Sequence, residues 1–235
     1  MSALSPAPDL IGIRGLPPGA RTIWAPAHPS NYFSADARDQ WRGGGAAYGG
    51  AARRFIAICY HTPEEPFDDH EVTPQWFANP NANASTGYYV DSDGDIFQMV
   101  RDADFAWAQG VRTADLVLPR PAWWRDEYVS YNTCMLSIEI EGYADRIGET
   151  FTIGSRQFAA VAALSAYFCR RYQIPTDRDY HLGHAQLTRH KSDPGANFRW
   201  DALLAAVAAQ LAVVEPPLES RVAELERRLG VLESE

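Results

Sequence analysis

The sequence contains little cysteine, and what it has is scattered. Only Cys59, Cys134 and Cys169 occur in 235 residues, and no two of them form a Cys-x-x-Cys pair. A framework of disulfides is therefore excluded. Cys59 and Cys169 stand within apolar stretches, so we expect buried free thiols, consistent with synthesis in a reducing compartment.

Long apolar runs and an excess of basic side chains are also missing. No run approaches the roughly 18 apolar residues of a membrane span, and the first twenty residues lack the pattern of a secretory signal. We therefore expect no membrane insertion, and synthesis in the cytoplasm. Lys and Arg number 21 against 30 Asp and Glu, and the resulting formal net charge of -9 disfavours nucleic-acid binding.

Three parts of the chain differ in pattern. Residues 1–52 are rich in Pro, Gly and Ala without a sustained period, which predicts an irregular leader, wrapped on the domain or flexible. Residues 53–215 alternate strand-like and helix-like segments, which indicates one domain of α/β or α+β class. Residues 216–235 carry apolar residues at the a and d spacing of a short coiled-coil-like helix. These apolar residues are Leu218, Val222, Leu225, Leu229 and Leu232.

The C-terminal heptads permit more than one interpretation. About two heptads are marginal as an isolated helix. Three interpretations of residues 218–232 remain: a helix that forms a homo-oligomer, a helix that docks on its own domain, and a helix that continues into further chain.

Short apolar runs predict the strands, and longer periodic segments predict the helices. The Asp-Gly pair at 93–94 predicts a hairpin, and we reject a calcium loop because the glycine falls too early for an EF-hand. In residues 136–141, Glu139 and Glu141 share one face of a strand. The expected strands lie at 53–61, within 86–101, at 136–141 and at 180–184; the expected helices lie at 74–78, between Ser155 and Pro175, and at 200–214.

Two histidines at strand ends and one loop aspartate form a candidate metal site. His61 ends the strand at 53–61, His184 ends the strand at 180–184, and Asp193 follows on a loop. Two imidazole nitrogens and one carboxylate oxygen are a ligand set of catalytic zinc, which keeps a fourth position open. The set is complete without the remaining histidines.

The motifs around these residues resemble those of a known family. Besides the strand ending in His61, the blocks are STGYYVDSDGDIFQMV at 85–100, AWAQG at 106–110, SIEIEG at 137–142 and GHAQLTRHKSDPGANFRW at 183–200. In this order they resemble the type 2 N-acetylmuramoyl-L-alanine amidases, which share their fold with peptidoglycan recognition proteins and many phage endolysins. The resemblance covers roughly residues 53 to 201. It implies a central mixed β-sheet flanked by helices.

The resemblance also implies roles for single residues. His61, His184 and Asp193 match the family's zinc ligands, with one Zn²⁺ per chain. Glu139 matches the general base, and Lys191 the basic residue that stabilises the oxyanion. Three further residues are candidate substrate contacts. These are Trp107; Tyr88, with core packing as the alternative; and Glu141, which is also the second candidate for the base.

Two departures from the family pattern affect substrate contacts only. Gly87 and Ala108 stand where the family usually has histidines that do not bind the metal. We therefore expect a hydrolase that cuts the amide between N-acetylmuramic acid and L-alanine, with peptidoglycan or muropeptides as partner. An endolysin that reaches the cell wall after release is the first expectation. A cytoplasmic muropeptide-recycling amidase and a non-catalytic peptidoglycan-binding module are the alternatives.

Overall fold

The computed structural model describes residues 5–34, 55–125 and 130–213. The expected heptad helix within 216–235 lies outside these ranges, and so does the oligomer contact proposed for 218–232. Within the described ranges, no helix is long and apolar enough to cross a membrane.

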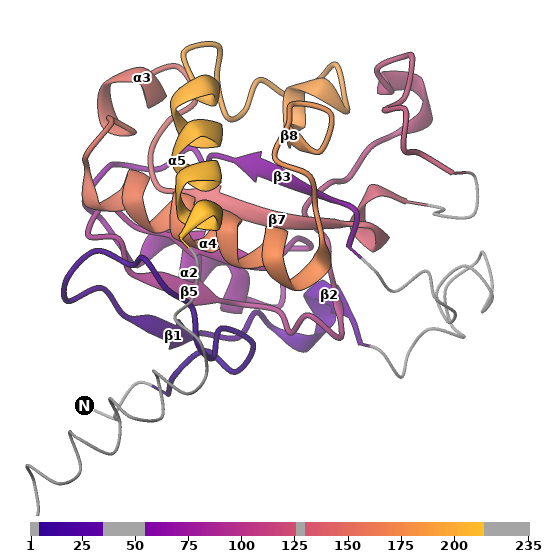
Figure 1. Ribbon diagram of the computed structural model, residues 1–235. Helices are drawn as coiled ribbons and strands as arrows, with labels where there is room; N and C mark the ends of the chain where they lie inside the picture. The colour runs from indigo at the N-terminus through magenta and orange to yellow at the C-terminus, as the bar shows by residue number, and fades with distance from the viewer. Residues whose placement is uncertain (1–4, 35–54, 126–129, 214–235) are drawn as a thin grey trace, which may run out of the picture.

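A six-stranded mixed sheet forms the centre of the molecule (Figure 1). Its order is β1-β5-β4-β7-β3-β8, in which β4, β7, β3 and β8 are parallel and β5 runs antiparallel to β4. The expected mixed sheet and the hairpin around Asp93-Gly94 are thus confirmed. The strands are β1 Thr22–Trp24, β3 Ala57–His61, β4 Tyr88–Val90, β5 Ile96–Gln98, β7 Met135–Ile140 and β8 His181–Gly183.

Helices cover both faces of this sheet. The two longest helices of the described ranges, α4 (Arg156–Tyr172) and α5 (Trp200–Ala212), pack together on one face, in front of the sheet in Figure 1. Ser155 caps α4 as expected, because its side chain accepts a hydrogen bond from the Phe158 amide. The short helix α2 (Val72–Ala78) lies on the opposite face. The small elements are α3 Ile147–Thr150 and a two-stranded pair, β2 Tyr32–Phe33 with β6 Phe105–Ala106.

Strand alternation separates core residues from site residues. Successive side chains of a strand point to opposite faces. Tyr60 and Ile138 therefore pack toward α4 and α5, in the largest hydrophobic cluster. His61 and Glu139 are register partners on adjacent parallel strands, and both point to the other face, which we call the groove face.

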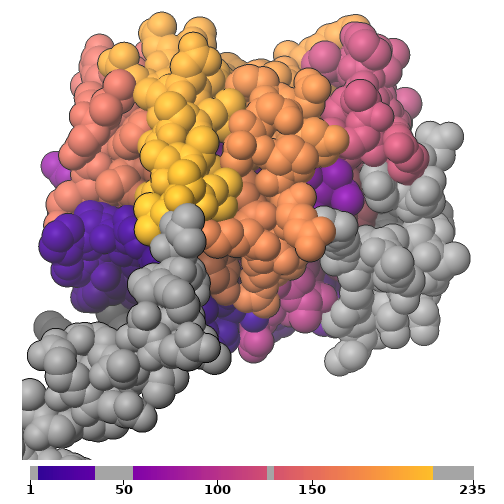
Figure 2. Space-filling model, viewed as in Figure 1, coloured from indigo at the N-terminus to yellow at the C-terminus, as the bar shows by residue number. Residues whose placement is uncertain are grey.

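The described part of residues 1–52 packs on the domain. β1 joins the sheet edge beside β5, and Leu10 and Ile23 are buried. The Asp9 carboxylate accepts hydrogen bonds from the side-chain amide of Gln98 (2.6 Å) and from Arg101 Nε (2.8 Å). Figure 2 shows this segment (indigo) lying against α5 (yellow). The sequence did not indicate β1, because three residues between proline- and glycine-rich stretches are too few for a periodic signal.

Candidate active site

Three buried side chains meet at the carboxyl ends of β3 and β8. His61 is the last residue of β3, His184 follows β8 in the 3-10 turn η7 (His184–Gln186), and Asp193 lies on the loop before α5. Asp193 Oδ2 lies 3.0 Å from His61 Nδ1 and 3.3 Å from His184 Nδ1. The structure therefore brings the three predicted metal ligands together.

Close backbone packing holds the loop that carries Asp193. The Asp193 carbonyl accepts a hydrogen bond from the Ala185 amide at 2.9 Å. Gly195 has φ +102°, and a Cβ atom there would meet the Ala144 carbonyl oxygen at 1.9 Å. A Cβ at Gly183 would meet Pro194 Cδ at 2.5 Å. Only glycine fits at these two positions without moving the loop, which explains their place in the 183–200 motif.

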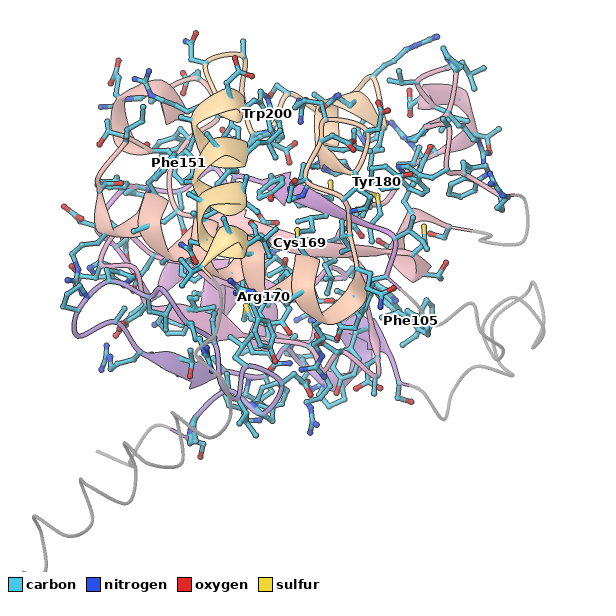
Figure 3. All side chains as sticks on the ribbon, viewed as in Figure 1. Phe105, Phe151, Cys169, Arg170, Tyr180 and Trp200 are labelled. Carbon is cyan, nitrogen blue, oxygen red and sulfur yellow. The ribbon has the colours of Figure 1, made fainter. Side chains whose placement is uncertain are left out.

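Aromatic side chains support the site from the opposite face of the sheet, where α4 and α5 pack. Phe198 stacks on Phe151 with ring centroids 4.9 Å apart and contacts Trp200 at 4.5 Å. Trp200 in turn meets Tyr60, the neighbour of His61, edge-on at 5.6 Å. Phe151 and Trp200 are labelled at the upper end of the ribbon in Figure 3. The Phe-x-Trp pair of the motif therefore packs against the strand that ends in His61.

The protonation states of the cluster suit a cation. Burial alone would raise the pKa of Asp193, but hydrogen bonds from His184 and His61 outweigh it and hold the pKa far below its usual range. Burial, reinforced by the neighbouring His61, lowers the pKa of His184 to about 4. At neutral pH the cluster thus offers a carboxylate and a neutral His184 imidazole, the forms that bind metal ions.

The spacing of the three side chains also fits a metal ion. One ligand atom from each lies within 4.8 Å of the others. Tetrahedral zinc, with bonds of about 2.0–2.1 Å, separates its ligand atoms by about 3.3 Å. The two separations from Asp193 Oδ2, 3.0 and 3.3 Å, match that value. The cluster is therefore able to hold a metal ion with two imidazoles and one carboxylate.

Glu139 lies beside this cluster on β7. It is 8% exposed, and its Oε2 atom is buried with no hydrogen-bond partner in the described part of the chain. Burial raises the pKa of Glu139 well above its usual value, and the charge of Asp193 adds to the effect, while Lys191 opposes it. Lys191 is exposed at the edge of the groove, close enough for its charge to act on Glu139.

The cluster opens into a groove of about 500 Å³, which we call the ligand groove. One wall is α2, whose Val72 and Trp76 are 42% and 52% exposed. Another wall contains Trp107, held by a hydrogen bond from its amide to Ser85 Oγ (2.9 Å). The predicted position of Trp107 in the groove agrees with the structure.

Two predicted substrate contacts do not reach the ligand groove. Tyr88 is fully buried on the opposite face, where its hydroxyl donates to Asp102, so the alternative of core packing holds. Glu141 is also fully buried, and its Oε1 accepts the amides of Asp69 and His70, each at 2.8 Å. Glu141 therefore holds the loop before α2 and does not line the ligand groove.

The sequence did not reveal several side chains of the ligand groove. Glu65 is buried, and its Oε2 accepts the Thr73 hydroxyl at 2.8 Å. Burial raises the pKa of Glu65. Val72 and Trp76 were also missed, because only the packing of α2 on the sheet shows which of its side chains face the groove. The one signal in the sequence was the presence of a tryptophan, Trp76, in the short helix expected at 74–78.

Comparison with known proteins places this geometry in a family. The model of the N-acetylmuramoyl-L-alanine amidases matches residues 52–196. A selenomethionine derivative of AmpD is 22% identical, with a TM-score of 0.52, and the match covers 82% of this chain and 96% of that one.

Two further solved structures have lower scores. The Staphylococcus aureus hydrolase AmiA, crystallised with its ligand, is 16% identical, with a TM-score of 0.47, and the match covers 71% of this chain and 77% of that one. The Ph2119 endolysin from a Thermus scotoductus bacteriophage is 14% identical, with a TM-score of 0.44, and the match covers 73% of this chain and 96% of that one. The comparison with curated proteins gives no match.

At these identities, the likeness to AmpD concerns the fold. The family model carries the assignment, because it spans more than half of the chain. The chain belongs to the N-acetylmuramoyl-L-alanine amidase family and is an enzyme of that activity.

Proposed function

We propose that the chain is a zinc-dependent amidase that cuts the bond between N-acetylmuramic acid and the L-alanine of the stem peptide. The observation that carries the proposal is the buried cluster of His61, His184 and Asp193 at the base of the ligand groove. A second carboxyl group, that of Glu139, lies next to it on the same face of the sheet.

The three clustered side chains would hold one zinc ion per chain. Bound there, zinc would lower the pKa of a water molecule and polarise the carbonyl under attack. The carboxylate of Asp193 offsets part of the metal charge. The two histidines keep their positions because each is fixed by the end of a buried strand.

Glu139 is the proposed general base. Its raised pKa reflects burial near another carboxylate, and a divalent cation in the cluster would reverse that effect and favour ionisation. The carboxylate then takes a proton from the attacking water and returns it to the nitrogen of the departing alanine. Its unpartnered Oε2 atom is available for this transfer.

Lys191 is the proposed partner of the developing oxyanion. Its ammonium group lies at the edge of the ligand groove, on the same loop as Asp193. A fixed positive charge at the reacting carbonyl stabilises the transition state more than the neutral substrate. Trp107 and Trp76 would position the substrate between two apolar walls.

The biological setting is a separate part of the proposal. An endolysin, made in the cytoplasm and acting on the wall after release, cleaves intact sacculi. A recycling amidase acts on soluble muropeptides. We propose the endolysin setting, and a comparison of initial rates on purified sacculi and on soluble muramyl peptides tests it. Activity confined to the soluble fragments would favour recycling.

Mass spectrometry of digested peptidoglycan tests the bond. The expected products are a free lactyl carboxyl group on muramic acid and stem peptides with a free L-alanine amine. Cleaved glycan chains or cleaved cross-bridges would contradict the proposal. Treatment with a chelator should abolish product formation, and added zinc should restore it.

A further inference from the structure

A second hollow lies beside the ligand groove, on the loop between β6 and β7. Its volume is about 330 Å³, within the range of about 300–1,000 Å³ found for small-molecule sites. We call it the loop hollow. The lining residues used below are Val111, Thr113, Arg120, Trp124, Tyr131 and Asn132.

The loop hollow and the ligand groove share one stretch of backbone. Trp107 and Ala108 line the groove, Gly110 and Val111 line the hollow, and only Gln109 separates them. Two residue steps span at most about 7 Å. The backbone amide of Gln109 donates a hydrogen bond to Asn132 Oδ1 at 2.6 Å, which holds this stretch of backbone in place. The two sites are therefore close enough for one extended ligand to occupy both.

The lining of the loop hollow includes Tyr131, whose hydroxyl group is buried and lacks a partner. Tyr131 is 3% exposed, and its Oη atom has no hydrogen-bond partner among the residues that the structure describes. Burial raises the pKa of Tyr131 to about 12, so the hydroxyl remains a donor at neutral pH. An unsatisfied buried hydroxyl destabilises the fold, and a ligand that offers it an acceptor would remove that cost.

The remaining lining combines an aromatic surface with neutral polar groups and one cation. The Trp124 and Tyr131 rings lie 4.5 Å apart, and the Arg120 guanidinium sits 4.3 Å from the Trp124 ring centroid. Thr113 and Asn132 add a hydroxyl and an amide. A hexopyranose ring has the matching features, since its C–H faces are apolar and its edge carries hydroxyl groups.

We propose that the loop hollow binds an N-acetylhexosamine ring of the glycan strand, next to the muramic acid held in the ligand groove. This inference rests on the proposed function for the identity of the ligand. The stem peptide is the weaker candidate because it carries several carboxylates, whereas Arg120 is the only basic residue among the described residues that line the hollow. That guanidinium also stacks on Trp124.

Titration calorimetry of the zinc-loaded full chain with the β-1,4-linked tetramer of N-acetylglucosamine tests the inference. Tyr131→Phe removes only the unpartnered hydroxyl, and Arg120→Gln removes the cation. Each should weaken binding at least fivefold. Arg146→Gln is the matched control, because this exposed arginine directly precedes α3, which lies far from the loop at 110–125 in Figure 1. Binding by Arg146→Gln should stay within twofold of the wild type.

Kinetics provide the second measurement. Both hollow variants should raise KM on sacculi about fivefold, with kcat unchanged, and leave KM on a minimal muramyl peptide unaltered. Equal tetramer affinity in all variants would overturn the inference. So would binding of a free stem peptide, instead of the tetramer, that Tyr131→Phe weakens. Absence of amidase activity in the wild type would count against the proposed function, whereas the binding result would stand on its own.

Discussion

Replacing Asp193 by asparagine tests the metal site with little change in shape. The side chain keeps its size and an acceptor oxygen, but it loses the charge that faces His61 and His184 at 3.0 and 3.3 Å. Loss of a partner that only orients a metal ligand already weakens metal binding about 10–100-fold. Loss of the anionic ligand itself should therefore weaken zinc binding at least about 100-fold.

The expected thermal shifts follow from this factor. Zinc at about 1,000 times the wild-type Kd stabilises the folded chain by about 4.1 kcal/mol. A variant with 100-fold weaker binding gains only about 1.4 kcal/mol at the same concentration. For a domain of this size, 1 kcal/mol corresponds to about 2–4 °C in Tm. Zinc should thus raise the Tm by about 8–16 °C in the wild type and by about 3–6 °C in Asp193→Asn.

Differential scanning calorimetry measures each protein with and without zinc, so that the effect of the substitution on the metal-free fold cancels. Asp115→Asn is the matched control, since Asp115 Oδ2 also faces a histidine, His190 Nδ1, at 3.4 Å but lies outside the cluster. It should retain the full shift. An equal zinc shift in Asp193→Asn and the wild type would refute Asp193 as a ligand, and no shift in the wild type would refute the zinc site.

Three further substitutions have expected outcomes. Glu139→Gln should lower kcat about 10²–10⁴-fold without reducing the zinc content, and a normal kcat would exclude Glu139 as the base. Trp76→Ala should raise KM several-fold with kcat unchanged, because Trp76 is half exposed on the groove wall; an unchanged KM would remove this residue from the substrate site. Burial raises the pKa of Asp91 to about 6, so the native state binds a proton more tightly than the unfolded chain does. The stability that this group contributes is therefore present at low pH and is lost as pH rises from about 4 to 6. Asp91→Asn should therefore stabilise the chain at pH 7 by on the order of 1 kcal/mol, allowing for solvent screening, and have little effect at pH 4; an equal gain at both pH values in thermal melts would contradict this explanation.

The meeting of His61, His184 and Asp193 could be predicted because its signals are local. His61 and His184 follow short apolar runs that end abruptly. Asp193 lies in a motif whose glycines stand where a Cβ atom would clash with neighbouring residues. Glu139 followed from alternation along one strand together with the family resemblance. The main helices and the parallel strands were likewise visible in their periods.

The errors concern information that depends on register and tertiary packing. Tyr88 faces the helices because it pairs with Ile138, and a single sequence does not show which residues of two strands are opposite each other. Glu141 lies beyond the end of β7, where its carboxylate is used by backbone amides of a loop distant in sequence. The groove wall formed by Trp76 exists only once α2 packs on the sheet.

The alternation of β3 links folding to catalysis. Tyr60 belongs to the main hydrophobic cluster and His61 to the metal cluster, on opposite faces of one strand. A slip of one residue in the pairing of β3 with β7 would exchange these faces, which would bury the histidine among the core side chains and turn the tyrosine into the groove. A molecule with a misaligned strand would therefore lose its core together with its metal site. Folding thus selects against molecules with an incomplete active site, and a well-folded preparation should bind the proposed zinc ion uniformly.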